Sequence, residues 1–379
     1  MHLGDCLGGY NFFEKNYETT LSEPRFIDRG EVTANVFAPD SRILEINSKS
    51  GLYPLYMAYS IYRAKVKNSL FSVSSIEDEQ RIWDKVVTEN IFVICKTPMA
   101  KSITKRTLIG FRKAKVNTRY FEDLINQIKN NPEYFIKQVD KFITDKTGIK
   151  NMKINAIVGS PPYQIMDGGA GVSAKPVYNE FVNIARTLSP GYMSMIMLSR
   201  WYAGGKELDS FRDSILKDKH ITSLFDYFDA TDVFPRIDLS GGVCYFLWSA
   251  NHNNDCAVTT SRNRIRNTLL RSLLENGADS FVRFNKTVNI MNKIPKEEQI
   301  FYTFVSPHKP FGIATDFKID KSVTKGVELF AYPNNGWFEI AQIPVHKEWI
   351  GKYKVFISYA YGERLSLIHI SEPTRRSYI

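Results

Sequence analysis

Short apolar segments alternate with longer mixed segments through the first 250 residues. The strand-like runs are Ile43–Ile46, Ile91–Cys95, Ile154–Val158, Tyr192–Leu198, Ile221–Tyr227 and Val243–Trp248. Helix-like stretches separate them, as at Leu52–Tyr62. Strands that alternate with helices favour right-handed crossovers and a mainly parallel sheet, so the sequence predicts an α/β fold. Ligands of such sheets bind at the carboxyl ends of the strands.

The pattern changes near residue 250. A polar break at Asn251–Asp255 is followed by an arginine-rich stretch, aromatic residues and turn residues. We therefore expect a lead-in segment at 1–40, one domain at 41–250 that is complete by Trp248, and a partial mixed α/β domain at 251–364. Residues 365–379 resemble the translation of a transposase adapter used in sequencing libraries, and we expect them to be a non-native tail.

Charge and cysteine usage narrow the class of protein. The formal net charge of +10 favours a polyanionic partner. The four cysteines form no Cys-x-x-Cys pair, which argues against a zinc site and a disulfide framework and fits a reducing, cytoplasmic compartment. The chain shows neither an apolar stretch long enough to span a membrane nor a signal-peptide layout, so we expect no membrane partner.

The segment Gly159–Gln164, with the sequence Gly-Ser-Pro-Pro-Tyr-Gln, carries the candidate chemistry. It follows a buried strand, and its two prolines fix the backbone while leaving their carbonyl groups free. A small polar side chain precedes the prolines and an aromatic ring follows them. This arrangement suits a flat heterocycle with an amino group, which can donate hydrogen bonds to the oxygens and stack on the ring.

Ser160-Pro161-Pro162-Tyr163 resembles the Asn/Asp/Ser-Pro-Pro-Tyr signature of DNA amino-methyltransferases. With the order of segments around it, the chain looks most like the adenine-specific methylases of restriction-modification systems, including the bifunctional type. The resemblance implies a Rossmann-like methyltransferase sheet, mainly parallel with an antiparallel last strand, followed by a target-recognition domain. It also implies S-adenosyl-L-methionine as cofactor, double-stranded DNA as partner and these four residues as the catalytic set. Nuclease or helicase regions of the same system are possible further partners.

The same resemblance assigns cofactor contacts. Glu45, Ser50 and Gly51 match the family's acidic strand end and following turn, and Asp123 matches an acidic residue that contacts the adenine part of the cofactor. Two positions depart from the pattern. Lys49 stands where a glycine is usual, and the strand that ends at Cys95 lacks the acidic residue that binds the ribose.

Further residues are assigned to DNA. Phe234 precedes the expected antiparallel strand and is the candidate that would stack on the target base opposite Tyr163. We expect a hairpin here, with Val233–Pro235 as its first arm. The candidate phosphate contacts lie in two basic stretches; they are Lys105 and Arg106 in one, and Arg262, Arg264 and Arg266 in the other.

The resulting hypothesis is transfer of a methyl group to the exocyclic amine of adenine. Enzymes that act on adenine usually carry Asn or Asp at the position of Ser160, whereas serine is commoner in enzymes that methylate the cytosine amino group. Methylation of cytosine is therefore one alternative. A DNA-binding specificity remnant without cofactor is the other, favoured by Lys49 and the missing ribose acid. The absence of a Pro-Cys dipeptide removes the covalent-thiolate route to cytosine carbon methylation.

Overall fold

The computed structural model describes residues 1–15, 17–68, 75–150, 152–165, 175–205, 207–237, 239–276 and 278–293, with short stretches at 305–306, 310–313, 322–329 and 336–353. The chain divides into two compact units, Met1–Met291 and Asn292–Ile379. The candidate site lies in the first unit.

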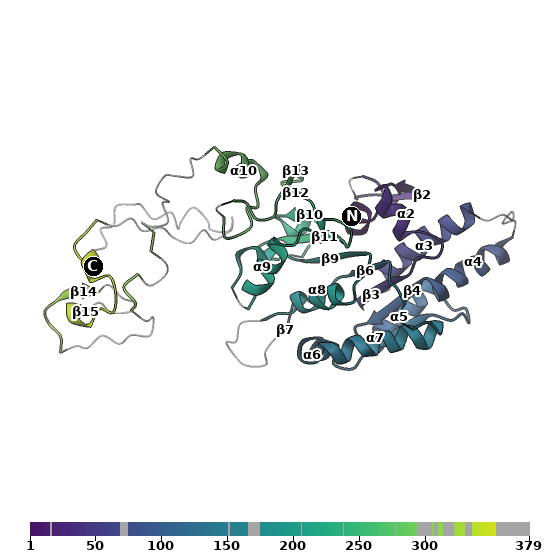
Figure 1. Cartoon of the computed structure of the whole chain (residues 1–379), viewed down its shortest axis with the longest axis horizontal. Helices are drawn as coiled ribbons and strands as arrows, with labels where there is room; N and C mark the ends of the chain where they lie inside the picture. The colour runs from purple at the N-terminus through teal and green to yellow at the C-terminus, as the bar shows by residue number, and fades with distance from the viewer. Residues whose placement is uncertain are drawn as a thin grey trace. The chain divides into compact units, whose positions relative to one another are not determined.

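A large mixed sheet forms the centre of the first unit (Figure 1). Among the described residues it has nine strands, here in their spatial order: β13 (Ile265–Arg271), β12 (Cys256–Arg262), β10 (Ile221–Tyr227), β11 (Val243–Ser249), β9 (Tyr192–Leu198), β6 (Ala156–Gly159), β3 (Ile43–Ser48), β4 (Ile91–Cys95) and β5 (Asn117–Tyr120). Strands β3, β9 and β11 are buried at every position. Burial on both faces explains why these strands appear in the sequence as continuous apolar runs.

The strand directions confirm the predicted Rossmann-like, mainly parallel sheet. Pairs β3–β4, β3–β6, β4–β5, β6–β9 and β10–β12 are parallel, and β11 runs antiparallel between β9 and β10. The carboxyl ends of seven strands therefore share one edge of the sheet. The expected hairpin differs in one respect. Its first arm is β10, whereas Val233–Pro235 lies in the connection after the short helix η2 (Ala230–Asp232).

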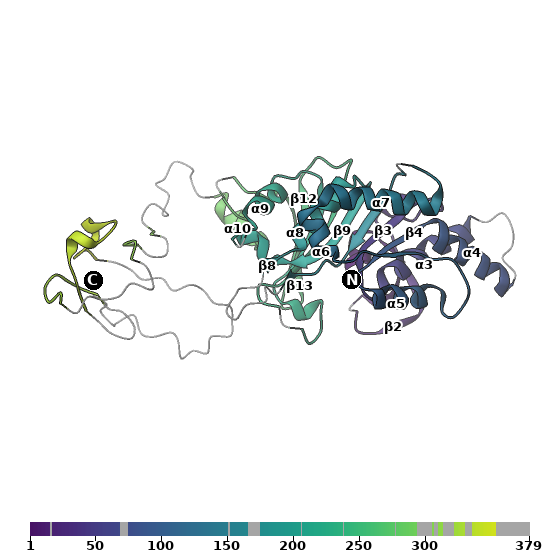
Figure 2. The same cartoon turned by 90° about the horizontal axis from the view of Figure 1, so that it is seen from below.

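Helices cover both faces of the sheet (Figure 2). The order of the strands across the sheet reverses between β5 and β6. Right-handed crossovers therefore place the helices before this reversal on one face and those after it on the other. One group is α3 (Leu52–Lys67), α4 (Ile76–Glu89) and α5 (Pro98–Ile109); the other is α6 (Leu124–Asn130), α7 (Pro132–Thr147), α8 (Tyr178–Thr187) and α9 (Asp209–Leu216). Packing agrees, since α3 contacts α4 and α5, and α6 contacts α7 and α8.

The expected lead-in segment is an ordered part of this unit. It contains α1 (His2–Cys6), the hairpin of β1 (Gly9–Phe13) and β2 (Thr20–Ile27), and α2 (Glu31–Val36). Helix α1 packs on β9 and β11. The ring of His2 bridges Tyr53 at the start of α3 and Ser194 in β9, at 2.7 and 2.8 Å. These contacts attach the segment to the sheet beside the candidate site.

The domain boundary expected near residue 250 falls inside the first unit. Strands β12 and β13 extend the sheet beyond β10, and the segment through α10 (Asn285–Met291) returns to it. Arg283 forms two hydrogen bonds, of 2.8 and 2.7 Å, with the fully buried carboxylate of Asp226 in β10. A buried charge needs such a partner. The sheet is therefore not complete at Trp248.

The remaining elements are short. In the first unit they are β7 (Gln164–Ile165), β8 (Lys175–Pro176) and η1 (Ser199–Ala203). The second unit has β14 (Val327–Leu329), β15 (Gly336–Phe338), η4 (Ile340–Gln342) and η5 (Lys347–Trp349), with Phe311, Phe338 and Ile343 buried together. Residues 365–379 lie outside the described residues. Within the described part of the chain, every helix is too short or too polar to cross a membrane.

Candidate functional site

Two turns meet at the carboxyl edge of the sheet, one after β3 and one after β6. The strands are neighbours, with Ile46 paired to Gly159. A side chain at Gly159 would bring its Cβ to 2.9 Å from the Ile46 carbonyl oxygen, so only glycine permits this approach. Asn47 has a left-handed backbone with φ of 73°, and its side-chain amide donates a hydrogen bond of 2.9 Å to the carbonyl of Ser160. The predicted cofactor turn is thus bonded directly to the predicted catalytic turn.

The Pro-Pro-Tyr turn presents both polar and aromatic groups. Ser160 and Pro162 are half-buried, and Pro161 is buried. The ring of Tyr163 packs against the core and is partly exposed. Its hydroxyl is buried without a hydrogen-bond partner, and burial raises the pKa of Tyr163. The partly exposed ring is the aromatic surface that this turn offers to a ligand.

Glu45 lies buried near the end of β3 and has an unsatisfied carboxylate. Its Oε2 atom is buried without a hydrogen-bond partner. Burial raises the pKa of Glu45 to about 8, although the Ser48 hydroxyl and the Lys49 ammonium oppose this shift. A buried carboxylate with an unused oxygen is complementary to a cationic or N–H donor group.

Lys49 interacts with both this carboxylate and the catalytic turn. Its Nζ atom is 3.5 Å from the hydroxyl oxygen of Ser160. Burial lowers the pKa of Lys49, the neighbouring Lys96 lowers it further, and Glu45 opposes them. Lys96 follows β4, and its N–H donates to the Ser48 carbonyl at 2.9 Å. Lys49 thus stands where the methylase pattern has a glycine, and Lys96 follows a strand that ends without the acidic residue of the pattern.

The turn through Ser50 and Gly51 is fixed by α5. The hydroxyl of Thr107 donates to the Ser50 carbonyl at 2.6 Å. Gly51 has a φ of 77°, and a Cβ there would lie 2.9 Å from the Cα of Thr104. Glycine is required at this position for helix packing, so a larger residue would disturb the fold as well as any ligand contact.

Asp123 lies at the same edge, after β5. It has a left-handed backbone with φ of 49° and precedes α6. Its exposed carboxylate accepts a hydrogen bond of 2.6 Å from Asn126. Strand β4 separates β5 from β3, so Asp123 is one strand further from the catalytic turn than Lys96 is.

Phe234 lies in the connection between β10 and β11 and is half-buried against the core. Among the residues that the structure describes, no ring contact joins Phe234 to Tyr163. Both residues lie in loops at the same edge of the sheet, but in this conformation their rings are not positioned to stack on the two sides of one base.

The basic residues of α5 are exposed. Lys105 and Arg106 both face solvent. The Arg106 guanidinium lies 4.3 Å from the ring centroid of Phe111, which is 89% exposed. This end of α5 therefore combines cations with an accessible aromatic ring, as nucleic-acid surfaces often do.

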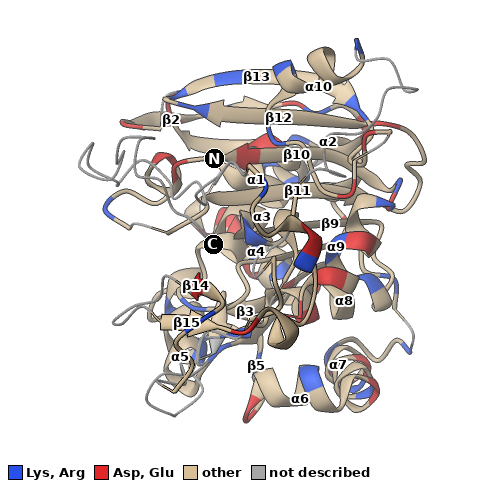
Figure 3. Cartoon of the chain, turned by 90° about the vertical axis from the view of Figure 1, so that its left-hand side faces the viewer, with Lys and Arg blue, Asp and Glu red and all other residues tan. Residues whose placement is uncertain are grey.

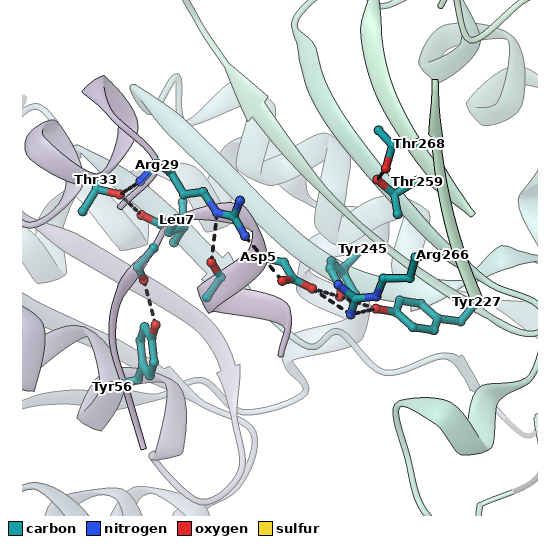
Figure 4. Close-up of polar contacts among 12 residues, drawn as sticks. Asp5, Leu7, Arg29, Thr33, Tyr56, Tyr227, Tyr245, Thr259, Arg266 and Thr268 are labelled. Carbon is teal, nitrogen blue, oxygen red and sulfur yellow. Dashed lines mark hydrogen bonds and ion pairs between the residues drawn. The ribbon is translucent and has the colours of Figure 1, made fainter. Parts of the chain in front are cut away.

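The three arginines of the β12–β13 hairpin have different surroundings. Strand β13 carries blue segments, which mark Lys and Arg, in Figure 3. Arg262 lies over the ring of Phe284, at 5.4 Å from its centroid. Arg264 is 80% exposed and forms an ion pair of 3.1 Å with Glu18. Arg266 instead points into the protein. It bonds to the buried carboxylate of Asp5 at 3.2 Å and to the hydroxyl of Tyr227 at 2.5 Å (Figure 4).

Asp5 is a residue that sequence reasoning missed. It accepts a hydrogen bond of 2.6 Å from Tyr245 in β11 and lies 3.5 Å from the guanidinium of Arg29 (Figure 4). Asn47 was missed in the same way. Each bonds to a residue more than a hundred positions away, Tyr245 for Asp5 and Ser160 for Asn47, so no local sequence pattern predicts these contacts.

Comparisons with known proteins agree with the motif. Residues 89–234 match the family model described as Eco57I restriction-modification methylase. A protein of Mycoplasma pneumoniae, described as an uncharacterized adenine-specific methylase, is 35% identical over 118 residues, which make up 30% of this chain and 28% of that protein. The match thus spans less than a third of its relative.

Solved structures of restriction-modification proteins are also similar. The EcoKI M protein, a type I restriction enzyme subunit, aligns with a TM-score of 0.37 and 11% identity over 60% of this chain and 46% of that chain. The type ISP enzyme LlaGI, in complex with a DNA substrate mimic, aligns with a TM-score of 0.39 and 11% identity over 62% of this chain and 22% of that chain.

The matched residues 89–234 include the Pro-Pro-Tyr turn, Asp123 and Phe234. The resemblance indicated by the motifs is therefore confirmed, since this part of the chain matches the Eco57I restriction-modification methylase model.

Proposed function

We propose that this chain transfers a methyl group from S-adenosylmethionine to the exocyclic amine of adenine in DNA, as part of a restriction-modification system. The bond between Asn47 and the Ser160 carbonyl is the observation that carries this proposal. It joins the turn that would hold the cofactor to the turn that would hold the base. The adenine-specific methylase similarity of the central segment supports the choice of substrate.

The chemistry required of the catalytic turn is modest. The amine of adenine is a poor nucleophile because its lone pair is delocalised into the ring. In the proposed complex the Pro161 carbonyl and the Ser160 hydroxyl accept hydrogen bonds from this amine and localise the lone pair. The base must first leave the helical stack, and stacking on Tyr163 offsets part of that cost by about 1–3 kcal/mol. Positioning and electrostatics then supply the rate enhancement.

The residues after β3 fit S-adenosylmethionine in part. The cofactor supplies a methyl group on a sulfonium and also carries an ammonium. Glu45 offers an unpaired buried carboxylate oxygen to such a cation. Ser50, Gly51 and Asp123 complete the proposed contacts. Lys49 and Lys96 oppose them by charge repulsion, so we propose a weak affinity that rises when Lys49 is neutralised.

The DNA contacts are proposed from exposure and charge. Lys105, Arg106, Arg262 and Arg264 lie on exposed positions. Arg266 is 38% exposed, but its guanidinium is bonded to Asp5 and Tyr227, so it is left out. Phe234 would complete the base sandwich after movement of its loop. Residues 251–364 remain the proposed recognition region, although part of this range also belongs to the central sheet. Nuclease or helicase regions of the same system are proposed as further partners.

Transfer of radiolabelled methyl groups into defined duplexes, followed by nucleoside analysis, tests the proposal. We expect N6-methyladenine, and a higher rate for Ser160→Asn, since the longer amide reaches further as an acceptor. Tyr163→Phe should keep activity because the hydroxyl has no partner. Tyr163→Ala should lose about 10- to 100-fold through lost stacking. A product methylated only on cytosine, in the wild type and in Ser160→Asn, would overturn the adenine assignment.

A further inference from the structure

A cavity opens at the same edge of the sheet, away from the Pro-Pro-Tyr turn. It has a volume of about 480 Å³ and lies between the β1–β2 turn, the loop after β10 and the β12–β13 hairpin. Strands β9 and β11 separate β10 from β6 in the sheet. At a spacing of about 4.8 Å per strand, the cavity is roughly 14 Å from the catalytic turn. Its volume is in the range of small-molecule sites.

The cavity wall combines aromatic and cationic groups. Phe13 and Tyr17 come from the β1–β2 turn, and Pro235 comes from the loop beside Phe234. Arg264 and Lys15 stand at its exposed side. Flat rings and prolines accept a stacked base, while exposed cations accept the phosphates on either side of it.

The cavity also contains an acceptor without a donor. Asp232 lines it, and the Oδ2 atom of this residue is buried without a hydrogen-bond partner. The side chain is only 13% exposed, and the cation nearest to it, Arg264, is 3.9 Å from the other oxygen, Oδ1. A buried carboxylate oxygen without a donor is costly, so this atom is suited to an N–H group of a ligand.

We propose that this cavity binds one unstacked nucleobase that carries an exocyclic amine, at a site distinct from the catalytic turn. The inference rests on the proposed function, because DNA bound at this edge of the sheet would bring bases to both places. The Asp232 carboxylate accepts a hydrogen bond from the amine, as carboxylates do from the N4 amine of cytosine. Thymine is disfavoured, because it carries a carbonyl oxygen where cytosine carries its amine. That oxygen and the Asp232 carboxylate are both acceptors, so they cannot bond to each other.

A binding experiment tests the site. The full chain is titrated against single-stranded 12-mers of dC, dT or abasic nucleotides, and fluorescence anisotropy at a fixed low salt concentration reports the binding. The two pyrimidines have the same ring size and differ in the group at position 4, so they form a matched pair. We expect dC to bind about tenfold more tightly than dT. The abasic oligonucleotide should bind more weakly than dC. Asp232→Asn should remove or reverse the preference, because its amide can donate to the thymine carbonyl.

Two further variants separate this site from its surroundings. Asp229→Asn is the matched control, since Asp229 lies in the same loop but its Oδ1 is already engaged by the N–H and hydroxyl of Thr231, at 2.8 and 2.7 Å. It should keep the preference for dC. Tyr163→Ala should also keep it, because the catalytic turn is elsewhere.

Equal binding of dC and dT by the wild-type chain would overturn the inference. So would a preference that Tyr163→Ala abolishes and Asp232→Asn retains. Methyl transfer by the same protein preparations into adenine-containing duplexes reports the proposed function independently. Loss of transfer with an intact base preference leaves this site standing, and transfer without base preference refutes this site alone.

Discussion

At the scale of single residues, the candidate site depends on charges that are only partly compensated. Glu45 is a buried carboxylate with one free oxygen, and Lys49 and Lys96 are neighbouring cations at the strand ends. The methylase pattern has a glycine at the position of Lys49 and an acidic residue at the end of the strand that precedes Lys96. Because Glu45 is buried among these cations, its protonation state should affect the stability of the protein and can be measured through it.

The stability of the chain should depend on pH through Glu45. Its pKa is about 8 in the folded state and 4.5 ordinarily, because burial disfavours the ionised carboxylate. The folded state therefore holds this proton more tightly than the unfolded state. The group lowers the free energy of unfolding progressively as the pH rises from 4.5 to about 8, and has no effect below 4.5.

Replacement of Glu45 by Gln should remove this dependence. Urea unfolding at pH 4.5, 6 and 8 should show a stability difference between Glu45→Gln and wild type that is smallest at the lowest pH and grows toward pH 8, in favour of the variant. Glu133→Gln, which changes an exposed carboxylate on α7, is the control. A difference that stays constant over this range would contradict the buried position of Glu45.

At the scale of elements, the β12–β13 hairpin carries arginines with two different roles. Arg264 is exposed, whereas Arg266 joins β13 to α1 through Asp5 and to β10 through Tyr227. The sequence alone assigned both to DNA, because charge runs do not reveal which side of an edge strand faces the protein. The β12–β13 hairpin therefore allows a direct comparison between an arginine bonded within the protein and an exposed one.

We expect Arg266→Met to destabilise the protein by about 1.5–3 kcal/mol, because hydrogen bonds to a buried charged group are lost. Arg264→Met should change stability by less than about 0.5 kcal/mol. Urea unfolding measures both values. In DNA titrations at several salt concentrations, Arg264→Met should reduce the salt slope by about 1, and Arg266→Met should leave it unchanged. The opposite assignment of the two effects would return Arg266 to the DNA-binding set.

Elements that are buried on both faces were predictable from the sequence. Strand β9, which is buried at every position, has the predicted bounds. Strand β10 has the predicted bounds as well, although three of its seven positions are only half-buried. The edge strands β5 and β13, and β12 beside β13, were not predicted. Their sequences, such as Asn-Thr-Arg-Tyr in β5, are polar and alternate weakly. The Pro-Pro-Tyr turn was recognisable because it is local, whereas the Asn47 and Asp5 contacts depend on the tertiary fold.

At the scale of the whole molecule, the compact unit extends to Met291 and not to residue 250. Strand β12 is the parallel neighbour of β10, and Val258 within it is fully buried. A chain that ends at 250 would leave the β10 edge unpaired and the Asp226 carboxylate without Arg283. Unpaired edges promote aggregation, and a buried carboxylate without its partner is costly.

A version of the protein that comprises residues 1–291 should therefore be monomeric and cooperatively folded, whereas residues 1–250 should aggregate or unfold. Light scattering and urea unfolding of the two versions compare them directly. Within 1–291, Arg283→Met should cost about 3–5 kcal/mol because it strands the Asp226 charge. The double variant Asp226→Asn with Arg283→Met should recover part of that loss, since the charge is then removed as well. If residues 1–250 were as stable and monodisperse as residues 1–291, β12, β13 and the Asp226–Arg283 pair would be dispensable, and the boundary expected from the sequence would be restored.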